Sequence, residues 1–506
     1  MNAKTLLVLG TSSDAGKSSV VTAICKILSE KYKVAPFKAQ NMSLNSWVSK
    51  DGKEISFAQV IQAWAAGAEP IPEMNPVVLK PKGDSISQVI VLGEHYADRT
   101  AGNYYESIDE MFKILNRALS KLEENFDVIV MEGAGGAAEI NLYDRDIVNI
   151  GTARLTKAPI ILVGDIERGG VFASLYGTIA LLPEDVRQNV KGFVINKFRG
   201  DPAILKPGLD QLEKMTGIPV LGVLPYFKLR IPSEDSMSFH EKAGSGAIPE
   251  EKKGRGQKTG LEIAVIQLPK ISHFNDFEVL ESEALVRYVQ LDDCLKNKNT
   301  NECPDLILLP GSGTPLQDLN ALKESGMMEQ ILELRKEYNC PVIGVGEGYQ
   351  LLGKTLTDPS GNKVAGFGLL ECDTVYEKEE GYSEKPERVT VVIDSKSKVN
   401  AGILKEVSGM TVDGFLAHSG KTTTRSPVFG NDGAVSADGM VLGTFTHGLF
   451  DNKQFRKALL RYLAARKGIQ YVEEEEFTVQ DGFAELAAVF EKNVDMKAIY
   501  KIMELK

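Results

Sequence analysis

The sequence is poor in the features that mark secreted, metal-binding or membrane proteins. Only five of its 506 residues are cysteine, without a C-x-x-C pair or a metal-ligand spacing; this usage favours a reducing compartment over a disulfide framework or a zinc site. No apolar run approaches the roughly 20 residues of a membrane helix, and the first one, residues 6–9, leads into a glycine loop instead of a cleavage site. The net charge of −11 argues against nucleic acid or a membrane surface as a partner. These deficits predict a cytoplasmic protein.

What the chain does have is length, and an alternation of short apolar runs with segments of helical periodicity. At 506 residues it is too long for one ordinary core, and the alternation is typical of parallel sheets covered by helices. The runs that indicate buried strands cover residues 5–9, 34–37, 128–131, 160–163, 192–195, 262–267, 306–309, 342–345 and 389–393. We therefore predict two three-layer α/β domains with mostly parallel sheets.

A compositional break divides the chain. Residues 241–260 are rich in Gly, Lys and Glu and poor in large apolar residues, so they cannot contribute to a core and indicate a linker. The predicted domains are therefore residues 1–240 and residues 261–506. The tail, residues 481–503, has the pattern of one or two amphipathic helices, which we expect to pack on the second domain.

The sharpest local signal follows the first predicted strand. Residues 10–19, GTSSDAGKSS, place small residues where backbone N–H groups converge on phosphate oxygens at a helix N-terminus. Lys17 would neutralise the β- and γ-phosphates of ATP, and the Ser18 hydroxyl would bind Mg²⁺. Thr11 replaces the first glycine of the usual pattern, and an ordinary strand-to-helix turn is the alternative. The predicted nucleotide contacts are Thr11, Ser12, Asp14, Ala15, Gly16, Lys17, Ser18 and Ser19.

Two more polar side chains follow predicted strands of the same domain. Lys38 comes after the second strand and is placed to reach the γ-phosphate or a carboxylate; a surface lysine is the alternative. Glu132 ends a buried strand, at the edge where ligands of α/β proteins bind, and a carboxylate there is a natural Mg²⁺ ligand. A helix N-cap or a loop charge is the alternative for Glu132. Together the two residues predict a catalytic site for ATP and Mg²⁺.

Several sequence blocks resemble, in order, those of the cobyric acid synthase family. They are FKAQNMS (37–43), MNPVVLKP (74–81), EINLYDRDIVN (139–149), GDIERGG (164–170) and NKFRGD (196–201). The resemblance extends from about residue 3 to the C-terminal helix. It implies a dethiobiotin-synthetase-like ATPase of the P-loop NTPase type, fused to a flavodoxin-like, class I glutamine amidotransferase domain.

The resemblance also implies a reaction. ATP would phosphorylate the b, d, e and g carboxylates of adenosylcobyrinic acid a,c-diamide, and ammonia would convert each acyl phosphate into an amide, giving cobyric acid. By the same resemblance Asn196 would contact adenine. Residues placed near the nucleotide or the corrinoid are Asn41, Lys80, Glu139, Asp146 and Arg168. For the basic side chains a solvated surface charge is the alternative.

The second domain departs from that family at its nucleophile. Residues 341–353 have the strand, sharp turn and helix of a nucleophile elbow, but Gly346 stands where the catalytic cysteine is expected and Glu347 follows it. Cys340, six residues earlier, lies roughly 20 Å away along an extended strand and cannot replace it. His447 matches the family's catalytic histidine, but it has no thiolate to activate, and a packing role is the alternative. We therefore predict an inactive glutaminase site.

Three hypotheses follow for the whole chain. The first is a ligase that takes free ammonia, or ammonia from a separate glutaminase, in place of its own hydrolysis of glutamine. The second keeps this chemistry on another tetrapyrrole carboxylate, because Leu44 stands where the family has asparagine. The third is a non-catalytic, nucleotide-gated binding protein, against which the phosphate loop and Lys38 argue.

Overall fold

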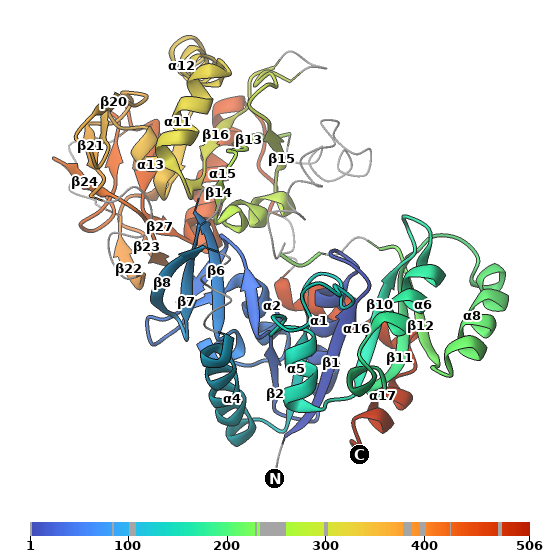
Figure 1. Ribbon diagram of the computed structural model, residues 1–506. Coiled ribbons are helices and arrows are strands. Elements are labelled where there is room, and N and C mark those ends of the chain that lie inside the picture. Colours follow the sequence, from blue (N-terminus) through green and yellow to red (C-terminus); the bar gives the residue numbers. More distant parts are fainter. Residues whose placement is uncertain are drawn as a thin grey trace.

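The fold consists of two α/β bodies, which lie one above the other in Figure 1. The computed structural model describes residues 3–82, 86–100, 108–227, 230–232, 260–297, 302–377, 386–393, 401–425, 427–473 and 478–506. Each body has its own six-stranded sheet, which confirms the predicted pair of α/β domains with mostly parallel sheets. Within the described ranges no helix is long and apolar enough to cross a membrane. Most of the predicted linker, residues 241–259, lies outside the described residues.

The lower body contains a parallel sheet in the order β12-β11-β10-β1-β9-β2. Successive apolar residues enter two different cores, with Leu7 and Leu9 on one face and Leu6 and Val8 on the other, because side chains alternate across a strand. The strands are β1 (Lys4–Gly10), β2 (Val34–Phe37), β9 (Val128–Glu132), β10 (Ile160–Asp165), β11 (Val190–Phe198) and β12 (Val220–Pro225). The strands expected here from the sequence are all present.

Helices cover both faces of this sheet and so complete three layers. In the long helix α4, for example, Met111, Leu115 and Leu122 are buried, at the spacing that places apolar residues on one helix face. The helices are α1 (Lys17–Leu28), α2 (Phe57–Ala65), α4 (Ile108–Asn125), α5 (Ile150–Thr156), α6 (Val171–Leu181), α7 (Glu184–Arg187) and α8 (Pro202–Thr216).

A smaller sheet, β3-β6-β7-β8, extends from the lower body to the upper one (Figure 1). Its strands and the adjoining hairpin are β3 (Gln40–Met42), β6 (Val77–Lys82), β7 (Ile86–Val91), β8 (Glu94–Thr100), β4 (Ser46–Val48) and β5 (Glu54–Ser56). Val48 packs against Phe415 and Ala417 of the upper body, and its carbonyl accepts a 2.8 Å hydrogen bond from Arg388. The two bodies are therefore in direct contact along this extension.

The upper body is built on a sheet in the order β15-β13-β16-β18-β26-β25, parallel except for β25. Its strands are β13 (Glu262–Ile266), β15 (Leu285–Val289), β16 (Leu306–Leu309), β18 (Val342–Val345), β25 (Ala434–Val435) and β26 (Val441–Thr444), and its helices are α11 (Pro315–Glu324), α12 (Met327–Glu337), α13 (Glu347–Leu351), α14 (Gly402–Val407) and α15 (Lys453–Lys467). The expected strand at 389–393 is β22 (Glu387–Val392), but it belongs to a separate antiparallel sheet with β23 (Thr411–Leu416) and β27 (Thr446–His447).

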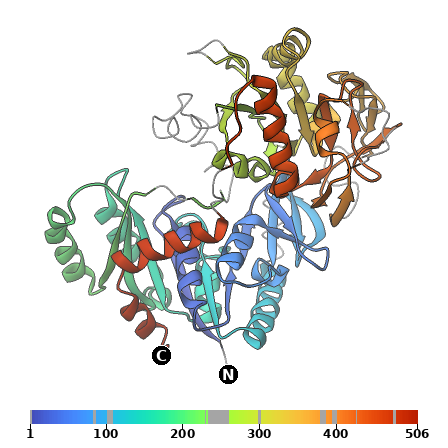
Figure 2. The same ribbon diagram turned by 180° about the vertical axis from the view of Figure 1, so that it is seen from behind.

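The C-terminal helices correct one expectation. α16 (Val479–Asn493) and α17 (Met496–Ile502) pack on the lower body, not on the second domain. Phe490 is fully buried in the core that α1 shares with the sheet, and Arg230 pairs with Glu485 at 2.8 Å. Figure 2 shows α16 as the red helix lying across the lower body. An amphipathic pattern shows that one helix face is buried but not which domain covers it, so this packing could not be read from the tail alone.

Candidate active sites

The phosphate loop lies between β1 and α1, where the sequence predicts it. Gly16 has φ of 97°, and a Cβ there would lie 1.9 Å from Nδ2 of Asn196, so only glycine fits. Asn196 in turn donates to the carbonyl of Ala15 at 3.1 Å. Lys17 donates to the carbonyl of Gly135 at 2.9 Å, which holds its ammonium group between the loop and the segment after β9. The other predicted nucleotide contacts lie in the same turn or in the first turn of α1: Thr11, Ser12, Asp14, Ser18 and Ser19.

A buried carboxylate stands at the centre of this site. Glu132, at the end of β9, is 1% exposed, and it accepts hydrogen bonds from Ser18 at 2.9 Å, from Lys38 at 2.8 Å and from Gln62. Burial alone would raise the pKa of Glu132, but Lys38, Gln62 and Lys17 hold it below its ordinary value. The carboxylate is therefore ionised. Since Lys38 is buried in this ion pair, the alternative of a solvated surface lysine is wrong, and so is that of a loop charge for Glu132.

The Ser18 hydroxyl and the Glu132 carboxylate form a donor set that fits Mg²⁺, which prefers oxygen ligands and keeps several waters or phosphate oxygens in its shell. In the part of the chain that the structure describes, no group of three or more His, Cys, Asp or Glu side chains is placed to hold a metal ion.

A charged rim surrounds the phosphate loop. Lys197 directly follows Asn196 on β11, and it pairs with Asp14 of the loop at 2.9 Å and with Asp165 at 3.1 Å. Arg168 lies 3.8 Å from the same Asp14, so the structure brings this predicted residue to the loop. Its side chain is 71% exposed, which leaves it accessible to a ligand.

Two predicted acidic residues occupy the segment after β9. Asp146 accepts backbone hydrogen bonds at 2.8 and 2.7 Å and bonds the side chain of Asn149 at 3.0 Å. Asn149 in turn bonds the backbone just after Glu132, so Asp146 positions this segment. Glu139 is exposed and lies beside the loop, because a Cβ on Gly136 would be 3.0 Å from its carboxylate and 3.2 Å from the carbonyl of Thr11.

The predicted corrinoid residues Asn41 and Lys80 lie on the extension. Asn41 donates to the hydroxyl of Ser56 at 2.6 Å. Lys80 is 5% exposed, pairs with the buried carboxylate of Glu54 and donates to Ser46 at 3.1 Å. A solvated surface charge is therefore wrong for Lys80.

The elbow of the upper body keeps its backbone geometry. Gly346, between β18 and α13, has φ of 60° and ψ of −130°, a conformation that costs a residue with a side chain about 1–3 kcal/mol. A Cβ on Gly344 would lie 2.6 Å from the carbonyl of Gly348, and one on Gly348 would lie 2.1 Å from that of Leu309. The flanking glycines are thus required by close packing. The turn is a nucleophile elbow in shape, as the sequence predicts.

None of the three buried thiols is activated. Burial raises the pKa of Cys340 to about 12 and that of Cys372 to about 12, and it raises the pKa of Cys25 still further. Cys340 contacts the carbonyl of Pro304 at 3.2 Å, at the far end of the strand from the elbow. These thiols are packing residues, as expected.

The histidine opposite the elbow retains its relay. His447 is fully buried, and its Nδ1 lies 2.7 Å from a carboxylate oxygen of Asp276. Its Nε2 has no hydrogen-bond partner among the described residues, and a Cβ on Gly346 would lie 3.0 Å from that nitrogen. Burial would lower the pKa of His447, but Asp276 and Glu347 raise it above its ordinary value. The pair has the form of a catalytic base facing a position without a nucleophile.

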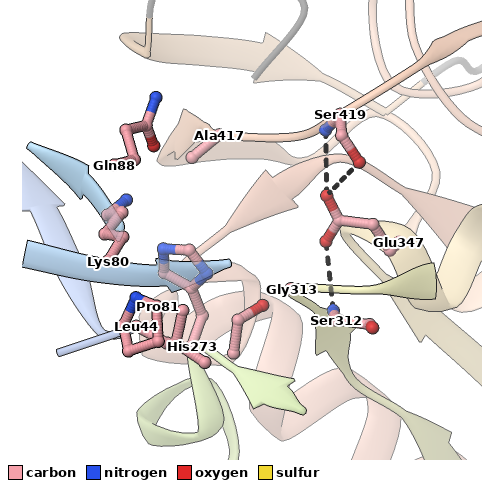
Figure 3. A pocket seen from close by; sticks show the side chains of 11 residues that line it. Leu44, Lys80, Pro81, Gln88, His273, Ser312, Gly313, Glu347, Ala417 and Ser419 are labelled. Atoms are coloured by element: carbon pink, nitrogen blue, oxygen red, sulfur yellow. Dashed lines mark hydrogen bonds between the residues drawn. The ribbon is translucent and has the colours of Figure 1, made fainter. Parts of the chain in front are cut away.

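Glu347 fills part of the space in front of this base. Its carboxylate is buried and accepts hydrogen bonds from the backbone of Ser312 at 3.2 Å, from the backbone of Ser419 at 2.9 Å and from the Ser419 hydroxyl at 3.3 Å (Figure 3). Ser312 lies in residues 310–314, a segment that resembles the oxyanion-side loop of the family's amidotransferase domain. The carboxylate therefore occupies an N–H group that a glutaminase needs for its substrate.

Comparison with known proteins agrees with this geometry. Residues 6–237 match the model of the CobQ/CobB/MinD/ParA nucleotide binding domain, and residues 262–455 match that of the CobB/CobQ-like glutamine amidotransferase domain. The "Probable cobyric acid synthase" of Methanosarcina barkeri is 56% identical over 99% of this chain and 100% of its own length. The chain belongs to the cobyric acid synthase family. Proteins with the same name in Methanosarcina acetivorans and Methanocella arvoryzae are 56% and 50% identical over 99% of this chain and 99% of their own lengths.

Membership in the cobyric acid synthase family confirms the predicted family and the predicted kinds of domain. It does not favour another tetrapyrrole substrate or a non-catalytic binding protein. Sequence reasoning missed several site residues that the structure identifies, namely Gln62, Asn149, Lys197 and Asp276. Gln62 and Asp276 contact their partners across 70 and 171 residues of chain, so no local motif marks them. Asn149 and Lys197 lie inside the blocks 139–149 and 196–201, which marked the region but not these side chains.

Proposed function

We propose that this chain is an ATP-dependent ligase that converts the b, d, e and g carboxylates of adenosylcobyrinic acid a,c-diamide into amides, giving cobyric acid. The family and the names of the relatives support the substrate. The observation that carries the chemistry is the cluster of Ser18, Lys38 and Glu132 beside the phosphate loop.

The reaction requires two transfers. A carboxylate oxygen of the substrate attacks the γ-phosphorus of ATP and ADP leaves, because an unmodified carboxylate oxygen is a poor leaving group. Ammonia then attacks the acyl carbon of this acyl phosphate, loses a proton, and displaces inorganic phosphate. Lys17 and the loop N–H groups stabilise the phosphoryl charge during transfer, and Lys38 is placed to orient the reacting oxygens.

We propose Mg²⁺ as the accompanying cation. Ser18 and Glu132 would hold it, and it would supply charge neutralisation between the β- and γ-phosphates. Asn196, at the end of β11 beside the loop, would contact the adenine, and Arg168 at the rim would meet the corrinoid carboxylates. Asn41 and Lys80 would contact the corrinoid from the extension, and Glu139 from beside the loop.

We further propose that the nitrogen comes from ammonia, either free or released by a separate glutaminase. Gly346 supports this, since a triad without a thiol cannot form the thioester of glutamine hydrolysis. His447 would then position neighbouring groups and would not act as a base. We propose residues 1–240 and 261–506 as the two functional units, except that α16 and α17 are structurally part of the first unit. We further propose that the protein acts in the cytoplasm.

The test is mass spectrometry of cobyrinic acid a,c-diamide after incubation with the purified chain, ATP and Mg²⁺. We expect stepwise amidation with ammonium chloride and none with glutamine that is free of ammonia. Amidation with glutamine alone would refute the proposed nitrogen source. If neither donor gives product while ATP is bound, the proposed ligase activity is wrong.

A further inference from the structure

A small pocket lies between the two bodies, in front of the elbow (Figure 3). Its wall combines side chains of the extension with side chains of the upper body: Leu44, Lys80, Pro81, Gln88, His273, Glu347 and Ala417 are among them. The volume open to the centre of a water-sized sphere is about 50 Å³. Since about 10–15 Å³ of such space holds one water, the pocket suits a few water-sized molecules.

The charges around the pocket are not balanced. Lys80 faces the carboxylate of Glu54, and His447 faces that of Asp276. Glu347, which is 3% exposed, receives only neutral donors within the described part of the chain. Asp276 and Glu347 both raise the pKa of the single imidazole of His447, so these two buried carboxylates share one cation. The excess negative charge is costly, and the site favours a small positive ligand.

The pocket also offers a second acceptor. His273 is 2% exposed, and neither of its ring nitrogens has a hydrogen-bond partner among the described residues. Its ring lies over that of His447, with 4.1 Å between the ring centres. Burial, together with His447 and Lys80, lowers the pKa of His273 well below its ordinary value, so the ring is neutral and presents one nitrogen as an acceptor.

We infer that this pocket binds ammonium, the water-sized cation that yields the ammonia of the proposed reaction once it has released one proton to water. The Glu347 carboxylate and the neutral His273 ring supply acceptors for its N–H groups. This inference rests on the proposed function and adds the place where the nitrogen donor is taken up. A glycine in place of Glu347 would leave the pocket without its anion, so the residue that obstructs glutamine chemistry is the one that recognises the new donor.

The pocket is joined to the nucleotide site by one short segment. Lys38 bonds Glu132, and Leu44, six residues further along the chain, lines the pocket. At about 3.3 Å per residue this segment spans at most about 20 Å. The pocket therefore lies within about 20 Å of Lys38 and of the phosphate loop beside it.

The first test is the KM for ammonium, with ATP and corrinoid saturating and ionic strength fixed. We expect Glu347→Gln to raise this KM about tenfold or more, because it removes a charge-assisted hydrogen bond, while kcat at saturating ammonium and the KM for ATP stay within about twofold. The matched control is Glu371→Gln, an exposed carboxylate of the same body that pairs with Lys354, and it should change neither constant. An unchanged KM in Glu347→Gln overturns the inference.

A second variant tests the same pocket in case Glu347→Gln does not fold. A Cβ on Gly313 would meet Leu44 at 3.6 Å, an ordinary contact, so Gly313→Ala should fold normally, narrow the pocket and also raise the KM for ammonium. If neither this variant nor Glu347→Gln moves the KM in chains with native melting temperatures, ammonium does not bind here.

The species that binds is tested in the unmodified chain. Between pH 7 and pH 8 the free-ammonia fraction rises about tenfold while ammonium stays nearly constant. The KM expressed as total ammonium should therefore stay constant if the cation binds; a roughly tenfold fall would identify neutral ammonia and overturn the inference. Absence of any ammonium-dependent product would instead refute the proposed function itself.

Discussion

The phosphate loop of the lower body and the elbow of the upper body are both strand-turn-helix motifs, but they differ in which reactive side chains they carry. In the loop, the glycine that the backbone requires and the side chains that chemistry requires are both present, with Lys17, Ser18 and Lys38 gathered around Glu132. In the elbow, the backbone and the His447–Asp276 pair remain, but the nucleophile position holds Gly346. Close packing therefore holds the elbow turn whether or not a nucleophile stands on it, so the shape of a turn alone does not show that its side chains are complete.

The largest expected effect tests the phosphate loop of the lower body. Lys17→Ala removes the cation that faces the phosphates, and we expect corrinoid-dependent phosphate release to fall by about 10²-fold or more. The exposed Lys191, which bonds only a neighbouring carbonyl in the described residues, supplies the control variant Lys191→Ala. Turnover that survives Lys17→Ala would show that the loop does not handle the transferred phosphate.

The next prediction concerns the upper-body half. Gly346→Cys alone should not release glutamate from glutamine, because Glu347 still occupies the Ser312 N–H. The double variant Gly346→Cys, Glu347→Gly frees that N–H, and we expect measurable glutamate release from it. The control variant Gly346→Ala, Glu347→Gly has a side chain of similar size without the thiol, and it should not release glutamate. Equal rates of glutamate release in the single and double cysteine variants would contradict the assigned role of Glu347.

The smallest effect sharpens an electrostatic contrast between the two bodies. Lys38 holds the pKa of Glu132 low, whereas burial and Asp276 raise the pKa of Asp451 to about 7 from 3.8. Between pH 3.8 and pH 7 the folded chain keeps the Asp451 proton that the unfolded chain loses. The stabilisation that protonated Asp451 provides is therefore complete at low pH and is lost as the pH rises through 7. Asp451→Asn should therefore gain roughly 1–3 kcal/mol relative to the unmodified chain between pH 5 and pH 8.

Urea unfolding at the two pH values measures this difference. The exposed Asp373 provides the control variant Asp373→Asn, which should track the unmodified chain at both. If Asp451→Asn also tracks it, the pKa of Asp451 is not raised in the folded protein.

Local patterns predicted the parts of the molecule that depend on neighbours in the chain. The loop, the central strands and the elbow each combine a sterically required glycine with an apolar run, and these signals are complete within about ten residues. The strand β26, the packing of the C-terminal helices and the Asp276 partner of His447 depend on contacts between distant segments. An amphipathic pattern or an acidic residue indicates that a partner exists but not which residues form it, so these features could be identified only from the structure.

Because α16 and α17 pack on the lower body, the chain both begins and ends in that body. The strands of the upper body follow β12 in the sequence, and the chain then returns to α1, where Phe490 and Ile499 are buried. The upper body is thereby inserted into the lower one and is held at both ends. Removal of α16 and α17 would therefore take core residues away from the lower body, although the upper body precedes these helices in the chain.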